Sequence, residues 1–197
     1  MQIILKKRLV LASNSPRRIT LLKMAGYHFD IIPHTIEEDI HCEIFPEKLV
    51  RNLAFLKTRD VAGKVDDALV ISADTIVVHK ENILGKPKDT RDAKRILTML
   101  SGSWHDIITA VCVIDVPSKK KLLRIDRTRI KMRKITKDEI ETYVRSGEPM
   151  DKAGAYAVQG EGKKFVEKMD GSFSNAVGLP LETVRKMLNN FIKNENA

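Results

Sequence analysis

A turn rich in serine and arginine near the start of the chain has the residue types that bind phosphate. Residues 8–11 are mostly apolar and predict a strand, and Ser15 and Pro16 follow at positions typical of a helix N-cap and of the first helical residue. A helix N-terminus offers backbone N–H groups and a partial positive charge, to which Arg17 and Arg18 add guanidinium groups. Because adjacent helical side chains diverge by about 100°, we expect one arginine to reach a ligand while the other braces the turn. An ordinary capped helix with solvated arginines is the competing interpretation.

Acidic side chains at two places are candidates for metal binding and proton transfer. Asp74 directly follows the apolar run 68–73, and α/β enzymes often place a metal ligand or a base at the end of a buried strand. Glu37 and Glu38 are adjacent in a polar segment, and Mg²⁺ takes carboxylates together with phosphate oxygens. The plainer alternatives are that Asp74 caps a turn and that the two glutamates belong to a solvated loop.

Two further segments place a polar side chain in a loop. Lys86 lies between Gly85 and Pro87, whose turn-forming character would hold the ammonium in place for a charge-assisted hydrogen bond to phosphate. Gln159 lies near the end of the glycine-containing block 151–160, where the backbone can approach a ligand closely. Its amide can accept from the ring N–H of a pyrimidine and donate to a ring carbonyl. An exposed lysine in a tight turn and a structural glutamine are the alternatives.

Length and composition indicate a globular protein. The chain has 197 residues, of which 43% are hydrophobic, enough for one substantial domain or two small lobes. We see no separable linker within residues 1–197 and expect one domain. No apolar run approaches the roughly 20 residues needed to span a bilayer, and the N-terminus lacks the shape of a signal peptide. We therefore expect a cytoplasmic protein with no membrane partner.

The net charge of +9 fits a polyanionic small substrate, a nucleic-acid partner or a lysine-rich proteome. Aromatic residues make up only 5% of the chain, and none interleaves with the densest basic stretch, 119–134, so nucleic acid is the weaker expectation. Cys42, Cys112 and the scattered histidines have no metal-site spacing, and we expect neither a zinc site nor a disulfide.

The elements that must position these side chains follow from hydrophobic periodicity and from capping signals. Strands are predicted at 8–13, 27–33, 68–72, 75–79, 106–116 and 121–132, and helices at 17–25, 46–62, 90–100, 136–146 and 181–193. Residues 116–120 predict a hairpin turn, and Thr136 with Glu139 fits a capping box. Intermixed strands and helices favour an α/β or α+β protein with a mixed sheet.

Six segments in this order resemble the Maf family of nucleoside triphosphate pyrophosphatases, over about residues 9–188. They are LASNSPRR at 11–18, ISADT at 71–75, LGKP at 84–87, SGSWH at 101–105, DKAGAYAVQG at 151–160 and GSFSNAVGLP at 171–180. The resemblance implies an elongated mixed β-sheet with two α/β lobes and a central cleft, as in Maf and inosine triphosphate pyrophosphatase folds. It also implies hydrolysis of a nucleoside triphosphate to the monophosphate and pyrophosphate, assisted by a divalent metal cation, Mg²⁺ or Mn²⁺.

The resemblance also implies roles for individual residues. Asp74 matches the proton acceptor of the family, and the positions tied to substrate choice are Arg17, Thr75 and Gln159. The other polar positions of the family's cleft are Ser13, Arg18, Glu37, Lys57 and Lys86. From these we expect Glu37 or Asp74 to hold the metal.

Substrate choice within the family is expected to depend on Gln159. The branch that acts on dTTP and UTP resembles this chain in having glutamine there, whereas the 7-methyl-GTP branch tends to have glutamate. Ala157 and Val158 depart from the usual Gly-Ile, and we expect different packing of this loop because alanine restricts φ more than glycine does. Two alternatives stay open. One is a 7-methyl-GTP pyrophosphatase, and the other is a nucleic-acid-binding regulator of division, since members of the family are linked to septum formation. The sequence leaves a homodimer open.

Overall fold

The computed structural model describes residues 7–37 and 45–193. Glu38 and Cys42 lie outside this part, whereas Cys112 is a buried free thiol. The strands are β1 Leu9–Leu11, β2 Asp30–Ile31, β3 Leu69–His79, β4 Asn82–Leu84, β5 Trp104–Asp115, β6 Lys120–Met132 and β7 Val166–Asp170. The α-helices are α1 Pro16–Met24, α2 Pro46–Ala62, α3 Thr90–Leu100, α4 Lys137–Arg145, α5 Phe173–Val177 and α6 Leu181–Lys193. Three 3-10 helices are η1 Glu148–Asp151, η2 Ala153–Ala155 and η3 Gly160–Phe165.

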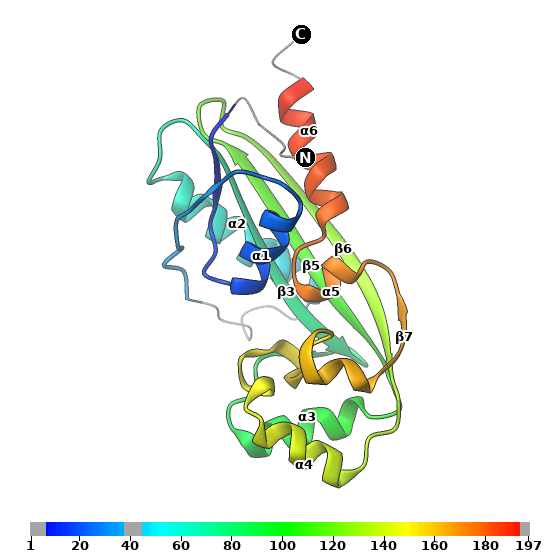
Figure 1. Cartoon of the computed structure of the whole chain (residues 1–197). Helices are drawn as coiled ribbons and strands as arrows, with labels where there is room; N and C mark the ends of the chain where they lie inside the picture. Colours follow the sequence, from blue (N-terminus) through cyan, green and yellow to red (C-terminus); the bar gives the residue numbers. More distant parts are fainter. Residues whose placement is uncertain (1–6, 38–44, 194–197) are drawn as a thin grey trace. The chain divides into compact units, whose positions relative to one another are not determined.

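The described strands form one seven-stranded mixed sheet in the order β2-β1-β3-β5-β6-β7, with β4 paired to β3. Strand β1 pairs in parallel with β2 and with β3, where Val10 lies opposite Val70. The pairs β3–β4 and β6–β7 are antiparallel, and β5 and β6 are long neighbouring strands (Figure 1). The mixed α/β fold expected from the sequence is confirmed.

The chain divides into two compact units built from interleaved segments. Unit 1 contains the described residues of Met1–Asp74, Thr109–Asp126 and Gly178–Ala197, and unit 2 contains Thr75–Ile108 and Arg127–Val177. The divisions fall inside β3, β5 and β6, so that each of these strands contributes residues to both units. No helix of the described chain is long and apolar enough to cross a membrane.

The core of unit 1 contains α2 and the adjoining strands. The buried stripe of α2 repeats every three or four residues, as an amphipathic helix requires; its members are Leu49, Val50, Leu53, Ala54, Lys57, Thr58 and Val61. Val61 packs with Val10 and Val70 in one buried cluster. Two polar side chains, Lys57 and Thr58, therefore lie on a buried helix face and require polar partners.

The sequence-based division of 68–79 into two strands is wrong. Residues Leu69–His79 form the single strand β3, and Asp74 lies within it instead of at its end. A charged residue in an apolar run predicts a strand end, but here the carboxylate has a buried cationic partner that allows the strand to continue. The predictions also omit β4, β7 and α5, which are short.

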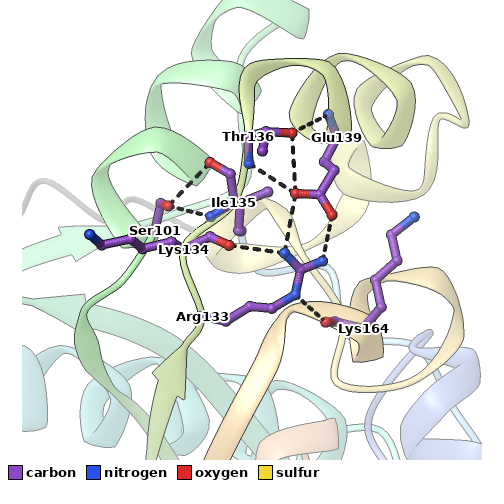
Figure 2. Close-up of polar contacts among 7 residues, drawn as sticks. All are labelled: Ser101, Arg133, Lys134, Ile135, Thr136, Glu139 and Lys164. Carbon is purple, nitrogen blue, oxygen red and sulfur yellow. Dashed lines mark hydrogen bonds and ion pairs between the residues drawn. The ribbon is translucent and has the colours of Figure 1, made fainter.

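In unit 2, helices α3 and α4 pack side by side (Figure 1). The predicted capping box of α4 is confirmed: Thr136 Oγ1 accepts from the Glu139 N–H, and the Glu139 carboxylate accepts from the Thr136 N–H. Arg133 forms a forked ion pair with the same carboxylate, with N–O distances of 2.6 and 3.1 Å (Figure 2). Its Nε also donates to the Lys164 carbonyl at 2.9 Å, which ties α4 to the segment that precedes β7.

We expect the substitution Glu139→Gln to lower the melting temperature at pH 7 and to have little effect near pH 2. The Arg133 hydrogen bonds, followed by the Thr136 N–H, lower the pKa of Glu139 from 4.5 to about 2. A lowered carboxyl pKa contributes stability that is complete above the unfolded value and is lost as the pH falls through the folded value. Thermal unfolding of both proteins from pH 7 to pH 2 measures this difference. A gap in melting temperature that stays constant with pH would contradict the assignment.

Candidate active site

A buried ion pair joins α2 to β3 in unit 1. Lys57 Nζ donates to Asp74 Oδ1 at 2.5 Å, and the two side chains are only 1% and 6% exposed. Isolated buried charges are costly, and a pair of this kind is stable only when both partners are present. Asp74 is therefore a carboxylate held at a fixed place by a cation, and its Oδ2 takes no part in this bond.

A second polar contact fixes the register of the same helix and strand. Ser72 lies two residues before Asp74 and thus on the same face of β3. Its hydroxyl donates to the Ala54 carbonyl at 2.7 Å and lies 2.7 Å from Thr58 Oγ1. Lys57 and Thr58 lie three and four residues after Ala54 on one helix face. Ser72 and Asp74 therefore contact the same turn of α2. The placement of the carboxylate is thereby fixed at two points.

The serine- and arginine-rich turn forms the entry to α1, also in unit 1. Ser15 is the N-cap and Pro16 the first helical residue, as predicted, but the Ser15 side chain makes no capping hydrogen bond. The buried Ser13 hydroxyl accepts from the Ser15 N–H at 3.1 Å and so shapes the turn. Arg18 Nε donates to the Gly178 carbonyl at 2.9 Å. Arg18 is thus the arginine that holds the turn in place, by binding the Gly178 carbonyl. Arg17 is half-buried at the start of the helix.

In unit 2, one backbone contact joins the two loops that carry Lys86 and Gln159. The Gly154 N–H donates to the Gly85 carbonyl at 3.0 Å. Gly154 has φ +72°, and a Cβ there would lie 3.0 Å from a methyl of Val77, so a larger residue at this position would be strained and tightly packed. This hydrogen bond makes neighbours of the LGKP and DKAGAYAVQG segments, which are about 70 residues apart in the sequence.

A histidine from the SGSWH segment holds the same block. His105 Nε2 lies 2.6 Å from the Tyr156 hydroxyl, and both side chains are buried. Burial, followed by the charge of His79, lowers the pKa of His105 to about 3, so the ring is neutral at pH 7. Ala155, next to this tyrosine, has φ +57°, a left-handed conformation that a non-glycine residue holds only where its surroundings fix it.

The side chains of Lys86 and Gln159 are exposed and make no hydrogen bond to the rest of the described chain. Thr75 is half-buried in β3, and the division between the units falls between Asp74 and Thr75. The structure thus brings Lys57 to Asp74 in unit 1 and the loops of Lys86 and Gln159 together in unit 2.

Metal binding by protein groups alone has no support in the described chain, where no three His, Cys, Asp or Glu side chains are grouped to hold an ion. Glu37 is exposed in the segment after β2. Mg²⁺ is commonly bound through one or two carboxylates, with substrate phosphates and waters completing the shell. Asp74 and Glu37 are carboxylates of the kind that this mode of binding uses.

A family model described as Maf-like protein matches residues 8–191, nearly the whole chain. The chain belongs to the Maf family. Curated relatives that carry the name dTTP/UTP pyrophosphatase match this Maf protein over most of both sequences. The relative from Alkaliphilus metalliredigens is 49% identical over 89% of this chain and 91% of its own. The relatives from Aquifex aeolicus and Dictyoglomus thermophilum are 46% and 44% identical, over 92% and 94% of this chain and 94% and 96% of their own.

Sequence reasoning did not single out the polar residues that support the site. In the sequence, Ser72 and Thr58 look like ordinary strand and helix residues. Their positions, two residues before Asp74 and one residue after Lys57, could have indicated a supporting role. Tyr143 lies in α4 and Glu148 in η1, before the block 151–160, and neither belongs to a segment with predicted chemistry. Their contacts, described below, are between segments that no local pattern connects.

Proposed function

We propose that this Maf-family protein is a nucleoside triphosphate pyrophosphatase that hydrolyses dTTP and UTP to the monophosphate and pyrophosphate. Two relatives named dTTP/UTP pyrophosphatase are 44% and 49% identical to this chain, over 94% and 89% of its length. The observation that carries the proposal is the buried Asp74 carboxylate fixed by Lys57 at 2.5 Å. A positioned carboxylate of this kind is what a hydrolytic reaction needs for proton transfer.

In this proposal Asp74 acts as the general base. It accepts a proton from the attacking water, whose oxygen bonds to the α phosphorus while the bond from that phosphorus to the bridging oxygen breaks. The electron pair of the broken bond leaves with pyrophosphate. Lys57 keeps the carboxylate in one orientation. Proton transfer to a positioned base is worth about 10²–10⁴-fold in rate where the geometry is right.

The cationic side chains would neutralise the charge of the phosphate chain. Arg17 and Lys86 are the candidates for direct contact, whereas Ser13 and Arg18 shape the turn at α1. Such electrostatic stabilisation of a leaving phosphate is commonly the largest single contribution to rate. Asp74 or Glu37 would hold a divalent cation, Mg²⁺ or Mn²⁺, which when bound supplies further polarisation of the phosphate oxygens.

Base selection is assigned to Gln159, with Thr75 and Arg17 as further contributors. Uracil and thymine present a ring N–H beside carbonyl oxygens, and the Gln159 amide offers an acceptor and a donor in the same order. The exposed position of this side chain and its lack of partners in the described chain leave it available for such a contact.

We expect pyrophosphate release from dTTP and UTP to exceed release from CTP, ATP and 7-methyl-GTP by at least about tenfold, as one lost hydrogen-bond pair would cause. The measurement is pyrophosphate release across this panel with Mg²⁺ or Mn²⁺, and with a chelator in place of the metal. A preference for 7-methyl-GTP would overturn the substrate assignment. Absence of hydrolysis, together with nucleic-acid binding that weakens steeply with salt, would favour the regulator instead.

A further inference from the structure

The backbone on both sides of Gln159 is held by a tyrosine and a glutamate from outside its own loop. The Glu148 carboxylate, in η1, accepts from the Gly162 N–H at Oε1 and from the Glu161 N–H at Oε2, both at 3.1 Å. The Tyr143 hydroxyl, in α4, accepts from the Ala157 N–H at 3.3 Å. These contacts reach two residues before Gln159 and two and three residues after it.

The two side chains also bind each other. The Tyr143 hydroxyl donates to Glu148 Oε1 at 2.8 Å, and the tyrosine ring packs edge-on against Phe165 with centroids 5.0 Å apart. Tyr143 is fully buried. Burial raises the pKa of Glu148, but the hydrogen bonds from Glu161, Tyr143 and Gly162 lower it, and the net pKa lies below its ordinary value. The carboxylate is therefore ionised and oriented at pH 7.

Two glycines of the loop make room for this arrangement. A Cβ at Gly160, where φ is +66°, would lie 2.5 Å from Glu148 Oε2, and a Cβ at Gly162 would lie 2.6 Å from the Tyr143 hydroxyl. Since real Cβ atoms do not approach so closely, another residue at either position would force the glutamate, the tyrosine or the loop to shift. The glycines, the carboxylate and the hydroxyl thus together hold the backbone on both sides of Gln159.

We propose that Tyr143 and Glu148 are positioning residues that fix the conformation of residues 157–162 and thereby set the base preference of Gln159. This inference rests on the proposed function, because it gives Gln159 a base to read. A site for a nucleobase needs its donor and acceptor held within a fraction of an ångström. The Gln159 side chain is exposed and makes no hydrogen bond within the described chain. Its placement therefore depends on the backbone beside it.

The test is a double-mutant cycle on base preference. Glu148→Gln keeps the size of the side chain but replaces one accepting oxygen with an NH₂ group, so one backbone N–H must lose its partner. We expect the ratio of kcat/KM for UTP to that for CTP to fall by about tenfold, mainly through a higher KM for UTP. In a Gln159→Ala background the same substitution should change the ratio by less than about twofold, because the two residues act through one contact.

The matched control is Glu161→Gln, which removes a carboxylate from the same loop at an exposed position and should leave the ratio unchanged. Hydrogen exchange gives a readout that needs no activity: the Glu161 and Gly162 amides should be protected in the wild type and exchange faster in Glu148→Gln. If UTP is hydrolysed and the ratio survives Glu148→Gln, or falls equally with and without Gln159, the positioning role is wrong although the proposed function stands. If no nucleotide is hydrolysed, the proposed function fails and the base-setting role fails with it, even where exchange shows the loop to be held.

Discussion

Replacing Asp74 with asparagine is expected to lower kcat by about 10²–10⁴-fold while the protein stays folded. The asparagine carbonyl can still accept from Lys57 Nζ, but the buried ammonium loses its counter-charge, so we also expect a lower melting temperature. What the substitution removes is the negative charge and the oxygen that would take a proton from water. Pyrophosphate release from UTP under saturating substrate measures the loss, and thermal unfolding verifies that the variant is folded.

The matched control for this prediction is Ser72→Ala. Ser72 lies on the same strand face two residues away and bonds the same turn of α2, but it carries no charge. Its loss is expected to cost about 1 kcal/mol of stability and to leave kcat within a few-fold of the wild type. Near-normal turnover in Asp74→Asn, or an equal loss in Ser72→Ala, would show that Asp74 is structural and not the base.

Replacing Gln159 with glutamate is expected to lower kcat/KM for UTP and dTTP by roughly ten- to hundredfold. A carboxylate can accept from the ring N–H, but it cannot donate to the neighbouring carbonyl and it repels that oxygen. Cytosine presents an amino donor in place of one carbonyl, and a carboxylate accepts from it. The activity on CTP should therefore fall less than the activity on UTP, or rise.

The comparison variant is Gln159→Ala, which removes the amide without adding a charge. Its loss on UTP should be smaller than that of Gln159→Glu, because only attraction is removed and no repulsion is introduced. The three proteins are compared by kcat/KM on UTP, dTTP and CTP at one metal concentration. An unchanged UTP preference in both variants would remove Gln159 from base recognition and transfer that role to Thr75 or Arg17.

Local signals in the sequence were sufficient for much of the secondary structure. Helices α2, α3 and α6 begin and end at the predicted residues, and the Thr136–Glu139 capping box is formed as expected. The predicted strand at 121–132 corresponds to β6, in which Thr128, Ile130 and Met132 are buried and Arg129 is exposed between them. These features depend on caps and on periodicity within a few residues, which the amino-acid order contains directly.

Only the tertiary structure decided which polar side chains meet. The partner of Asp74 is Lys57, 17 residues earlier in a helix, and without that cation the sequence could not predict that β3 continues through a buried carboxylate. The partners of the Gln159 loop, Tyr143 and Glu148, likewise come from other elements. Pairing between distant residues depends on how helices pack on strands and loops. The free energy that selects this packing arises from burial of apolar surface across all the elements in contact, which no local sequence pattern contains.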